Sequence, residues 1–345
     1  MEPGSLWLNG GRRTEERMRF GIIGAGRIGK IHGGNVAARP DSEVVLVADA
    51  DPGAAAALAK ATGAKVGDVD MIFAAKEIDA VAICSPTDTH ADLIERAARS
   101  GKAIFCEKPI DLDVNRVRAC LDVVKQAGAT LMVGFNRRFD PNFAALRRRV
   151  AEGAIGALEV VSITSRDPAP PPLSYIARSG GLFRDMMIHD FDMARFILGE
   201  EPVAVSAMGS ALVDKAIGEA GDIDTAVVIM ETGSGKVAQI SNSRRAAYGY
   251  DQRVEAHGEK GMIRADNVRE TTVEWAGGHG FTSDKALNFF LERYDAAYRD
   301  ELDAFIGAAK SGVKPHPDGR DGLMALLLAD AAYRSWKTKQ RVVVG

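Results

Sequence analysis

The sequence is short of cysteine, of excess charge of either sign and of long apolar runs. It has three cysteines among 345 residues and no CxxC spacing, which argues against a disulfide framework and a structural zinc site. A formal net charge of −3 gives no basic excess for binding nucleic acid or an anionic membrane. No apolar run approaches the roughly 20 residues that span a bilayer. We therefore expect a cytoplasmic protein with reduced thiols and with no nucleic-acid or membrane partner.

The length of the chain favours two domains, because 345 residues exceed what one ordinary hydrophobic core organises. Residues 1–17 are polar, and their apolar cluster at residues 6–8 is far shorter than the core of a signal peptide. A strand pattern starts directly afterwards. We predict a disordered N-terminal extension over residues 1–17, with Met18 as the natural start.

A glycine-rich turn follows the first predicted strand. Residues 19–23 have the pattern of a short buried strand, residues 24–29 are Gly-Ala-Gly-Arg-Ile-Gly, and residues 30–38 continue as a helix. This is G-x-G-x-x-G in its required context of strand, tight turn and helix. The glycines allow the turn and the close approach of a pyrophosphate, and the helix N-terminus offers free N–H groups to phosphates. The motif predicts a dinucleotide site, although an ordinary Gly-rich turn can have the same sequence.

Asp49 ends the second predicted strand, residues 43–49, at the distance from the glycine turn expected of a ribose-binding carboxylate. This carboxylate can accept hydrogen bonds from both ribose hydroxyls of NAD. A 2′-phosphate charge about 4 Å away would be repelled by about 4 kcal/mol at an effective dielectric constant of ~20. Residues 50–52 bring no arginine to offset that repulsion. We therefore predict NAD rather than NADP.

Strands and helices then alternate up to residue 137. Strands are predicted at residues 79–84, 102–106 and 130–135, and helices at 54–62, 90–100 and 113–127. This alternation predicts an α/β fold, a Rossmann-type doubly wound parallel sheet over residues 18–137, with ligands at the carboxyl ends of its strands. The strand-end residues Ser85, Pro86, Thr87, Glu107 and Lys108 should therefore border the cofactor.

Residues 138–345 have the pattern of a second, α+β domain that binds substrate and mediates oligomerisation. A basic helix at 143–151 and a strand at 158–165 precede a stiff proline loop at 168–172. Further strands are predicted at 203–211, 225–231, 237–243, 252–256, 261–265 and 270–275. Their close spacing favours a largely antiparallel open sheet. Helices at 294–311 and 322–338 and a short strand at 341–344 close the chain.

Residues 180–196 are predicted as one helix that carries Asp185, His189 and Asp192 on a single stripe. Three interpretations of this stripe compete. It could be a surface face with a helix-stabilising Asp–His pair, a divalent-metal site, or a general base in which Asp185 sets the charge and tautomer of His189. No further ligand cluster lies nearby in the sequence, so we expect no metal.

Four stretches together resemble the glucose–fructose oxidoreductase/inositol dehydrogenase family (Gfo/Idh/MocA). They are the turn at 24–29, Phe-Cys-Glu-Lys-Pro at 105–109, Gly-Phe-Asn-Arg-Arg-Phe-Asp at 134–140, and Asp-x-x-x-His-Asp-Phe-Asp at 185–192. The resemblance runs from about Met18 to the end of the chain, and the last two stretches are typical of the inositol branch. It implies NAD-dependent oxidation of a cyclic polyol, myo-inositol to 2-keto-myo-inositol (scyllo-inosose) in inositol catabolism. It also implies a homo-oligomer, a tetramer joined through the open face of the second-domain sheet.

The resemblance also implies roles for individual residues. The catalytic residues would be Lys108, Asp185 and His189, and the polyol would contact Arg137, Asp192 and Tyr250. The cofactor would contact Gly24, Ala25, Gly26, Arg27, Ile28, Gly29, Asp49, Ser85, Pro86, Thr87, His90, Glu107 and Lys108. Ser165 stands where some inositol dehydrogenases have a histidine lining the sugar pocket, so the preferred stereoisomer stays open.

The chemistry of an alcohol oxidation suits these residue types. The hydride passes to the nicotinamide, and the hydroxyl proton needs a base such as His189, whose reference pKa is near 6.5. Lys108 could hydrogen-bond the same oxygen and stabilise the developing alkoxide. Each residue also has a simpler interpretation: Lys108 as a solvated strand-end cation, Arg137 as a helix-flanking arginine, and Tyr250 as a packing aromatic.

Other functions fit parts of the pattern. A dehydrogenase for another inositol isomer or a pyranose would use the same residues. A dinucleotide-sensing regulator without chemistry has no reason to keep Lys108, Asp185 and His189 together. A zinc alcohol dehydrogenase needs thiolate ligands, and no cysteine has ligand spacing with His189.

Overall fold

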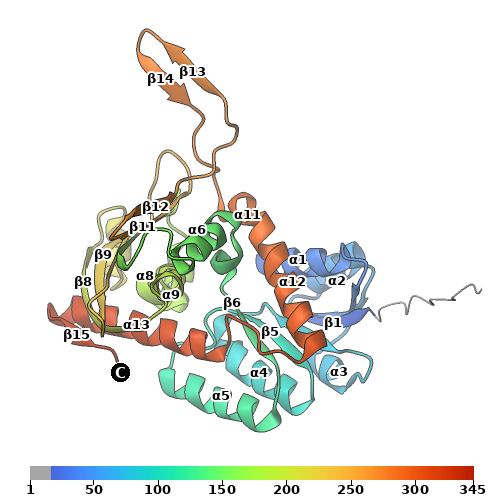
Figure 1. Ribbon diagram of the computed structural model, residues 1–345. Helices are drawn as coiled ribbons and strands as arrows, with labels where there is room; N and C mark the ends of the chain where they lie inside the picture. The colour runs from blue at the N-terminus through green and yellow to red at the C-terminus, as the bar shows by residue number, and fades with distance from the viewer. Residues whose placement is uncertain (1–16) are drawn as a thin grey trace, which may run out of the picture.

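A six-stranded parallel sheet organises the N-terminal domain of the computed structural model, which describes residues 17–345 (Figure 1). Its spatial order is β3-β2-β1-β4-β5-β6, the doubly wound order of dinucleotide-binding folds. The strands are β1 (Met18–Ile23), β2 (Ser42–Ala48), β3 (Lys65–Val66), β4 (Ala80–Ile83), β5 (Ala103–Glu107) and β6 (Leu131–Gly134). The predicted Rossmann sheet is confirmed. The prediction for residues 1–17 lies, apart from Arg17, outside the described residues.

The helices between these strands begin and end at residues with clear local signals. They are α1 (Arg27–Ala37), α2 (Pro52–Thr62), α3 (Val69–Ala74), α4 (His90–Arg99) and α5 (Val114–Ala127), with short 3-10 turns η1 (Thr87–Thr89) and η2 (Asn136–Phe139). The Asp51 and Asp113 side chains accept N–H bonds at the starts of α2 and α5, as N-cap residues do. Gly63 and Gly128 end the same helices in the left-handed conformation.

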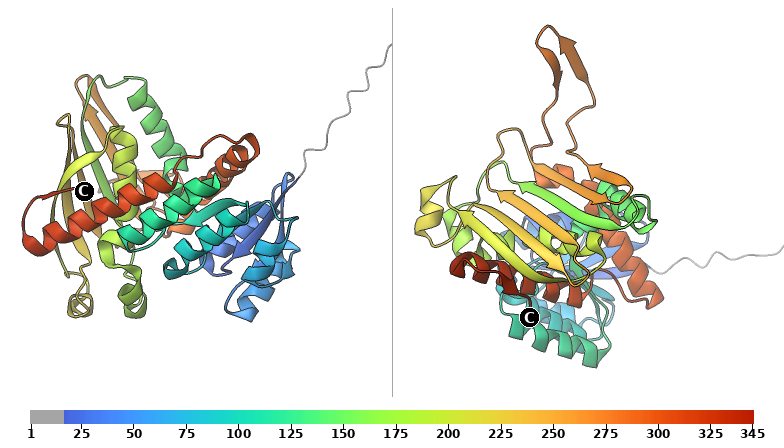
Figure 2. Two further views of the ribbon diagram at one scale, coloured as in Figure 1. Left: turned by 90° about the horizontal axis from the view of Figure 1, so that it is seen from below. Right: turned by 60° about the vertical axis from the view of Figure 1, so that its left-hand side comes forward.

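A seven-stranded sheet organises the second domain, in the order β12-β11-β7-β10-β9-β8-β15. The strands are β7 (Leu158–Arg166), β8 (Pro202–Ser210), β9 (Thr225–Thr232), β10 (Val237–Ser243), β11 (Asp251–Gly258), β12 (Gly261–Ala265) and β15 (Val342–Val343). Only the pair β7–β10 is parallel within this sheet. The predicted largely antiparallel sheet is confirmed, and its open face is turned toward the viewer in the right-hand panel of Figure 2.

Helices of the second domain cover the other face of this sheet and also reach the first domain. They are α6 (Pro141–Ala151), α7 (Leu173–Ser179), α8 (Gly181–Asp185), α9 (Ile188–Leu198), α10 (Lys215–Glu219), α11 (Phe290–Arg293), α12 (Asp295–Ser311) and α13 (Gly319–Thr338). Phe305 of α12 joins the apolar cluster of Phe20 and Phe105, and Leu326 of α13 joins the cluster on the opposite face of the parallel sheet. Residues beyond 138 therefore help to build the first core, which a division at residue 137 does not capture.

The expected single helix over residues 180–196 is wrong. The chain forms two helices, α8 and α9, with a turn at Met186 and Met187. The N–H groups of both residues bond to the carbonyl oxygen of Leu182, at 3.1 and 2.9 Å. The second of these bonds spans five residues instead of four, which inserts one residue into the helical repeat. Asp185 is therefore out of helical phase with His189 and Asp192.

The expected strand at residues 270–275 does not join the sheet. Instead β13 (Glu274–Gly277) pairs with β14 (Gly280–Ser283) as a separate hairpin that stands off the body of the molecule (Figure 1). Among residues 17–345, no helix is long and apolar enough to cross a membrane.

Candidate active site

The glycine turn leaves the N-terminus of α1 open. Gly24 has φ +99°, and a Cβ there would lie 2.5 Å from the backbone of Cys84 and Ser85, so only glycine fits. Gly26 is the N-cap of α1, and no side chain accepts a hydrogen bond from the first N–H groups of the helix. Nothing lies within 4 Å of the position that a Cβ of Gly26 would take. Free N–H groups thus face open space, which is what a pyrophosphate requires.

Asp49 lies directly beside this turn. Its Oδ2 accepts the N–H of Ala25 at 2.5 Å and its Oδ1 accepts the N–H of Asp51 at 2.8 Å. Both bonds fix the carboxylate at the end of β2. A carboxylate has about four acceptor sites, so the two ribose hydroxyls still find lone pairs. The turn and Asp49 together fit the dinucleotide that the sequence predicts.

The other predicted cofactor residues divide into those that line the strand ends and those that support them. Ser85 and Thr87 are partly exposed at the end of β4, and Glu107 and Lys108 lie at the end of β5. His90 is buried, and its ring nitrogens lie 2.7 Å from the Pro109 carbonyl oxygen and 2.8 Å from that of Ser85. His90 therefore connects the segments that directly follow β4 and β5.

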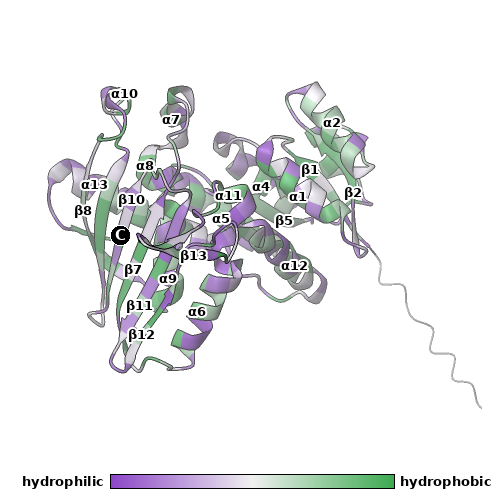
Figure 3. Ribbon diagram, turned by 90° about the horizontal axis from the view of Figure 1, so that it is seen from above, coloured by the Kyte–Doolittle hydropathy of each residue, from purple (hydrophilic) through white to green (hydrophobic). Residues whose placement is uncertain are grey.

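Arg27 and Ile28 of the glycine turn face the second domain. The Arg27 guanidinium lies 5.3 Å from the centre of the Phe289 ring, just before α11. Ile28 packs against the hydrophobic core of the second domain. Figure 3 shows α11 between the α1 side of the first domain and the sheet of the second. The predicted cofactor edge is thus closed on one side by residues distant in sequence.

Lys108 and Asp185 meet across the two domains. Lys108 Nζ donates to the backbone carbonyl oxygen of Asp185 at 3.0 Å and lies 3.9 Å from its Oδ1. Tyr175 donates its hydroxyl to Asp185 Oδ1 at 2.9 Å, and Arg244 donates to Oδ2 at 3.3 Å. Asp185 therefore holds the Lys108 ammonium, the Arg244 guanidinium and the Tyr175 hydroxyl in place.

His189 lies in the first turn of α9, close enough to Lys108 and Arg137 for both charges to act on it. Burial, then Lys108 and Arg137, hold its pKa well below the ordinary value of 6.5. Its Nδ1 is buried without a hydrogen-bond partner. Within residues 17–345 no hydrogen bond joins His189 to Asp185, so the expected pairing of these two side chains is absent. At neutral pH the ring is uncharged and ready to accept a proton.

Arg137 and Tyr250 come together as the sequence suggests, in a buried polar cluster with Asp190. Arg137 donates to Asp190 and to Ser165 Oγ, the latter at 3.3 Å, and its Nη2 lies 3.4 Å from the Tyr250 hydroxyl. Asn242 donates to the second oxygen of Asp190 at 2.9 Å. Burial raises the pKa of Tyr250 well above 10, so its hydroxyl keeps its proton and can donate.

Asp192 lies apart from this group. Arg138 donates to both of its oxygens, at 2.7 and 2.5 Å, and also to Asp321 at 2.9 Å, in a buried network that includes Arg195. The stripe that would unite Asp185, His189 and Asp192 is wrong, because the extra residue at the α8–α9 turn shifts the helical phase. A contact between Asp192 and a polyol stays a prediction that this pairing does not support.

Asp167 is a candidate site residue that the sequence analysis did not find. Burial raises its pKa to about 6, opposed by the nearby Arg244 and Arg137 charges and reinforced by Asp185 and Asp190. It directly follows the end of β7, two residues after Ser165. The strand-end position was the available signal, but a lone acid before a proline loop is not distinctive.

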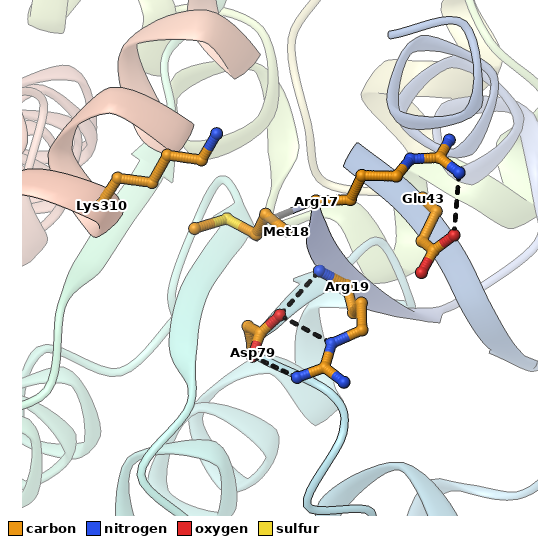
Figure 4. Close-up of a pocket in the computed structure, with 6 residues that line it drawn as sticks. All are labelled: Arg17, Met18, Arg19, Glu43, Asp79 and Lys310. Atoms are coloured by element: carbon orange, nitrogen blue, oxygen red, sulfur yellow. Dashed lines mark hydrogen bonds and ion pairs between the residues drawn. The ribbon is translucent and has the colours of Figure 1, made fainter. Parts of the chain in front are cut away.

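No group of three or more His, Cys, Asp or Glu residues is placed to hold a metal ion in the part of the chain from 17 to 345. A hollow lined by Arg17, Met18, Arg19, Glu43, Asp79 and Lys310 lies at the opposite edge of the parallel sheet (Figure 4). Arg17 pairs with Glu43 and Arg19 with Asp79, both at 3.1 Å. Because ligands of such sheets bind at the carboxyl ends of strands, this hollow is not the candidate active site.

Comparison with known proteins supports the same assignment. The model of an oxidoreductase family with an NAD-binding Rossmann fold matches residues 18–135, and the model of the GFO/IDH/MocA C-terminal domain matches residues 143–264. Inositol 2-dehydrogenase of Rhizobium meliloti is 59% identical over 95% of this chain and 99% of its own length. Myo-inositol 2-dehydrogenase of Thermotoga maritima is 48% identical over 94% and 98%.

A solved relative holds both ligands. The crystal structure of scyllo-inositol dehydrogenase from Lactobacillus casei with bound NAD(H) and scyllo-inositol superposes with a TM-score of 0.89 at 31% identity, covering 95% of this chain and 99% of that one. The open α1 terminus, Asp49 and these matches agree: the chain belongs to the GFO/IDH/MocA family and is an NAD-dependent oxidoreductase that acts on CH–OH groups.

Proposed function

We propose that the protein oxidises a secondary hydroxyl of a cyclic polyol, myo-inositol to 2-keto-myo-inositol (scyllo-inosose), in inositol catabolism. The observation that carries this proposal is the meeting of Lys108 with Asp185, beside a neutral His189, at the cofactor edge of the parallel sheet. The buried cluster of Arg137, Asp190 and Tyr250 lies next to this group and offers donors and acceptors for several hydroxyls. The names of the relatives at 59% and 48% identity support the same substrate class.

The residues divide the reaction between them. Bound NAD⁺ supplies the acceptor for the hydride that leaves the carbinol carbon. His189 accepts the hydroxyl proton at Nε2, since Nδ1 is enclosed by protein. Lys108 Nζ donates to the same oxygen and stabilises its developing negative charge. Asp185 holds Lys108 in position and is itself held by Tyr175 and Arg244.

The test is the initial rate of NADH formation, followed at 340 nm, with myo-inositol, other inositol isomers and aldoses, each with NAD and NADP. We expect the highest kcat/KM with myo-inositol and NAD. A Lys108→Met variant is the matched control, because it keeps the length of the side chain and removes the charge. Absence of polyol-dependent reduction of either cofactor would overturn the proposal.

A second candidate function is the oxidation of another inositol isomer. Ser165 is buried, accepts from Arg137 and donates to Gln252 Oε1 at 3.0 Å. A serine here leaves more room than the histidine of some inositol dehydrogenases. A higher kcat/KM with scyllo-inositol than with myo-inositol in the same assay would select this candidate.

We further propose a cytoplasmic homo-oligomer, a tetramer, joined through the open face of the second-domain sheet. That face carries the exposed side chains of Val203, Met208, Val227 and Ile229 on β8 and β9. Met208 lies directly opposite Val227 in the strand register, and Ile229 follows Val227 on the same exposed face of β9, so these three apolar side chains are neighbours. Contiguous exposed apolar surface marks interfaces. The three cysteines are unpaired, which suits a reducing compartment. Light scattering at micromolar concentration tests the assembly, and a monomer mass would contradict it.

A further inference from the structure

The β13–β14 hairpin, here named the arm (residues 269–286), exposes large apolar side chains that its own chain does not cover. Val273 is 69% exposed, Trp275 65% and Phe281 79%. The arm stands off the body in Figures 1 and 2. An isolated two-stranded hairpin is at best marginally stable in water. Burying these side chains against a partner surface would therefore stabilise the arm.

The base of the arm is hydrogen-bonded to the segment that leads into β11 and that contains Tyr250 of the buried polar cluster. Tyr250 donates its N–H to the carbonyl oxygen of Leu287 at 2.9 Å, and the Ala286 N–H donates to the carbonyl oxygen of Tyr248 at 3.2 Å. On the other side, the Gln252 N–H donates to Asn267 Oδ1 at 2.7 Å. The arm is thus held at both ends beside the candidate active site and projects from it in a defined direction.

A surface that matches the arm lies on the outer side of the catalytic group. We name the proline loop and α7 (residues 168–179) the outer wall. Leu173 is 43% and Tyr175 47% exposed there, although the Tyr175 hydroxyl bonds to Asp185. The outer wall therefore contacts the Asp185 carboxylate through Tyr175, and its apolar side chains are partly exposed to solvent.

The two surfaces also carry opposite unpaired charges. Glu274 on the arm has no ion-pair partner, and neither has Arg178 on the outer wall, among the residues from 17 onward. Within one chain β13 and α7 lie apart, as Figure 3 shows. The arm therefore cannot cover the outer wall of its own chain without leaving its base.

We propose that the arm of one copy packs on the outer wall of a second copy, with Trp275 and Phe281 against Leu173 and Tyr175, and Glu274 beside Arg178. Under two-fold symmetry the contact occurs twice, since each copy gives one arm and receives the other. Each active site is then covered by an element of its partner. This inference rests on the proposed homo-oligomer, and it adds that the partner completes the site.

The first test uses the full chain with Trp275→Ser and Phe281→Ser combined. We expect a lower molecular mass in light scattering and a KM for myo-inositol raised by about tenfold or more, the scale of losing a buried aromatic anchor. The KM for NAD should change little, since the glycine turn that binds the cofactor lies on the first domain. Val313→Ser, another exposed apolar position (63%) on the segment after α12, is the matched control. An unchanged mass or an unchanged KM for the polyol in the double variant would overturn the inference.

The second test does not depend on activity. Glu274→Cys and Arg178→Cys in one chain should give a disulfide-linked dimer under mild oxidation, while either single variant gives none. Failure of the pair to cross-link more than the single variants overturns the inference. If the parent enzyme oxidises no polyol but the pair cross-links, the proposed function fails and the arm contact stands; if the parent is active and the pair does not cross-link, only the arm contact fails.

Discussion

Lys108 Nζ lies 3.0 Å from the backbone carbonyl oxygen of Asp185, across 77 positions of sequence and between two domains. The lysine follows β5 of the parallel sheet, and the carbonyl belongs to the last residue of α8. This one bond ties the cofactor edge of the first domain to the residues that receive the substrate proton in the second. Catalysis should therefore depend on the contact between the domains as well as on the chemistry of each side chain.

Replacing His189 by alanine should lower kcat by roughly 10²–10⁴-fold, the usual contribution of a positioned base. NAD affinity should barely change, because Asp49 and the glycine turn bind the cofactor. Lys108→Ala should also be damaging, and the double variant should lose less than the product of the two effects, since both side chains act on one oxygen. Steady-state kinetics of the four proteins check this, and turnover within a few-fold of the parent for His189→Ala would refute the catalytic assignment.

The acid limb of the pH–rate profile should lie below the ordinary histidine range. Burial and the charges of Lys108 and Arg137 lower the pKa of His189, so the ring stays neutral, and active as a base, to a pH well under 6.5. In Lys108→Met one positive charge is gone, protonation becomes easier, and the limb should move to higher pH. Plots of log(kcat/KM) from pH 5 to 9 test this. A limb at the same pH in both proteins would show that another group controls it.

The sequence could predict what local signals encode. The glycine turn, Asp49 and the alternation of strands and helices depend on residues near one another in the chain, and the parallel sheet followed from them. Contacts between residues far apart in the sequence could not be predicted from local signals. The apolar stripe of α12 does not reveal that Phe305 packs on the first domain. The residues of the arm have a strand pattern like that of the sheet strands, so the sequence does not show that the arm stands apart.

The site shows the same limit. A regular helical repeat places Asp192 with Asp185, but one five-residue hydrogen bond from Met187 to Leu182 shifts the phase. Asp190 then faces Arg137, and Asp192 turns to Arg138. No glycine, proline or other sequence signal marks this bulge, and both methionines at the turn are buried in the core.

Asp192→Asn should therefore act on stability more than on substrate binding. Its partners Arg138 and Arg195 are buried with it, and breaking a buried pair leaves a charge uncompensated at a cost of about 3–5 kcal/mol. We expect a clearly lower Tm and a KM for the polyol within a few-fold of the parent. The comparison variant is Asp190→Asn, which changes the cluster around Arg137 and should raise that KM. If Asp192→Asn raises KM while Tm holds, the residue contacts substrate after all.

Cofactor preference should depend on Asp49. Its two oxygens are fixed by the N–H groups of Ala25 and Asp51, which holds the negative charge where the 2′-phosphate of NADP would lie. Asp49→Ser combined with Ala50→Arg should shift the ratio of kcat/KM values toward NADP. Ala50→Arg alone is the control, since it adds a positive charge without removing the negative one. Equal use of NAD and NADP by the parent protein would contradict this account.

Glu301 of α12 should reduce stability as the pH rises. Its side chain is buried with both oxygens lacking a hydrogen-bond partner, and burial together with the charge of Glu107 raises its pKa well above 4.5. The folded protein therefore holds a proton on Glu301 that the unfolded chain releases. That contribution is complete below the unfolded pKa and is lost as the pH rises through the folded one.

Glu301→Gln removes this titration and keeps the shape of the side chain. The variant should match or exceed the parent in Tm at pH 8, by about 2–4 °C for each kcal/mol gained, and its Tm should vary less between pH 5 and pH 8.5. Glu292→Gln, at an exposed position of α11, is the control and should leave the profile of the parent unchanged. Differential scanning fluorimetry across this range measures the slopes. Parallel profiles for Glu301→Gln and the parent would mean that Glu301 does not change its protonation on folding, and that the pH dependence comes from other groups.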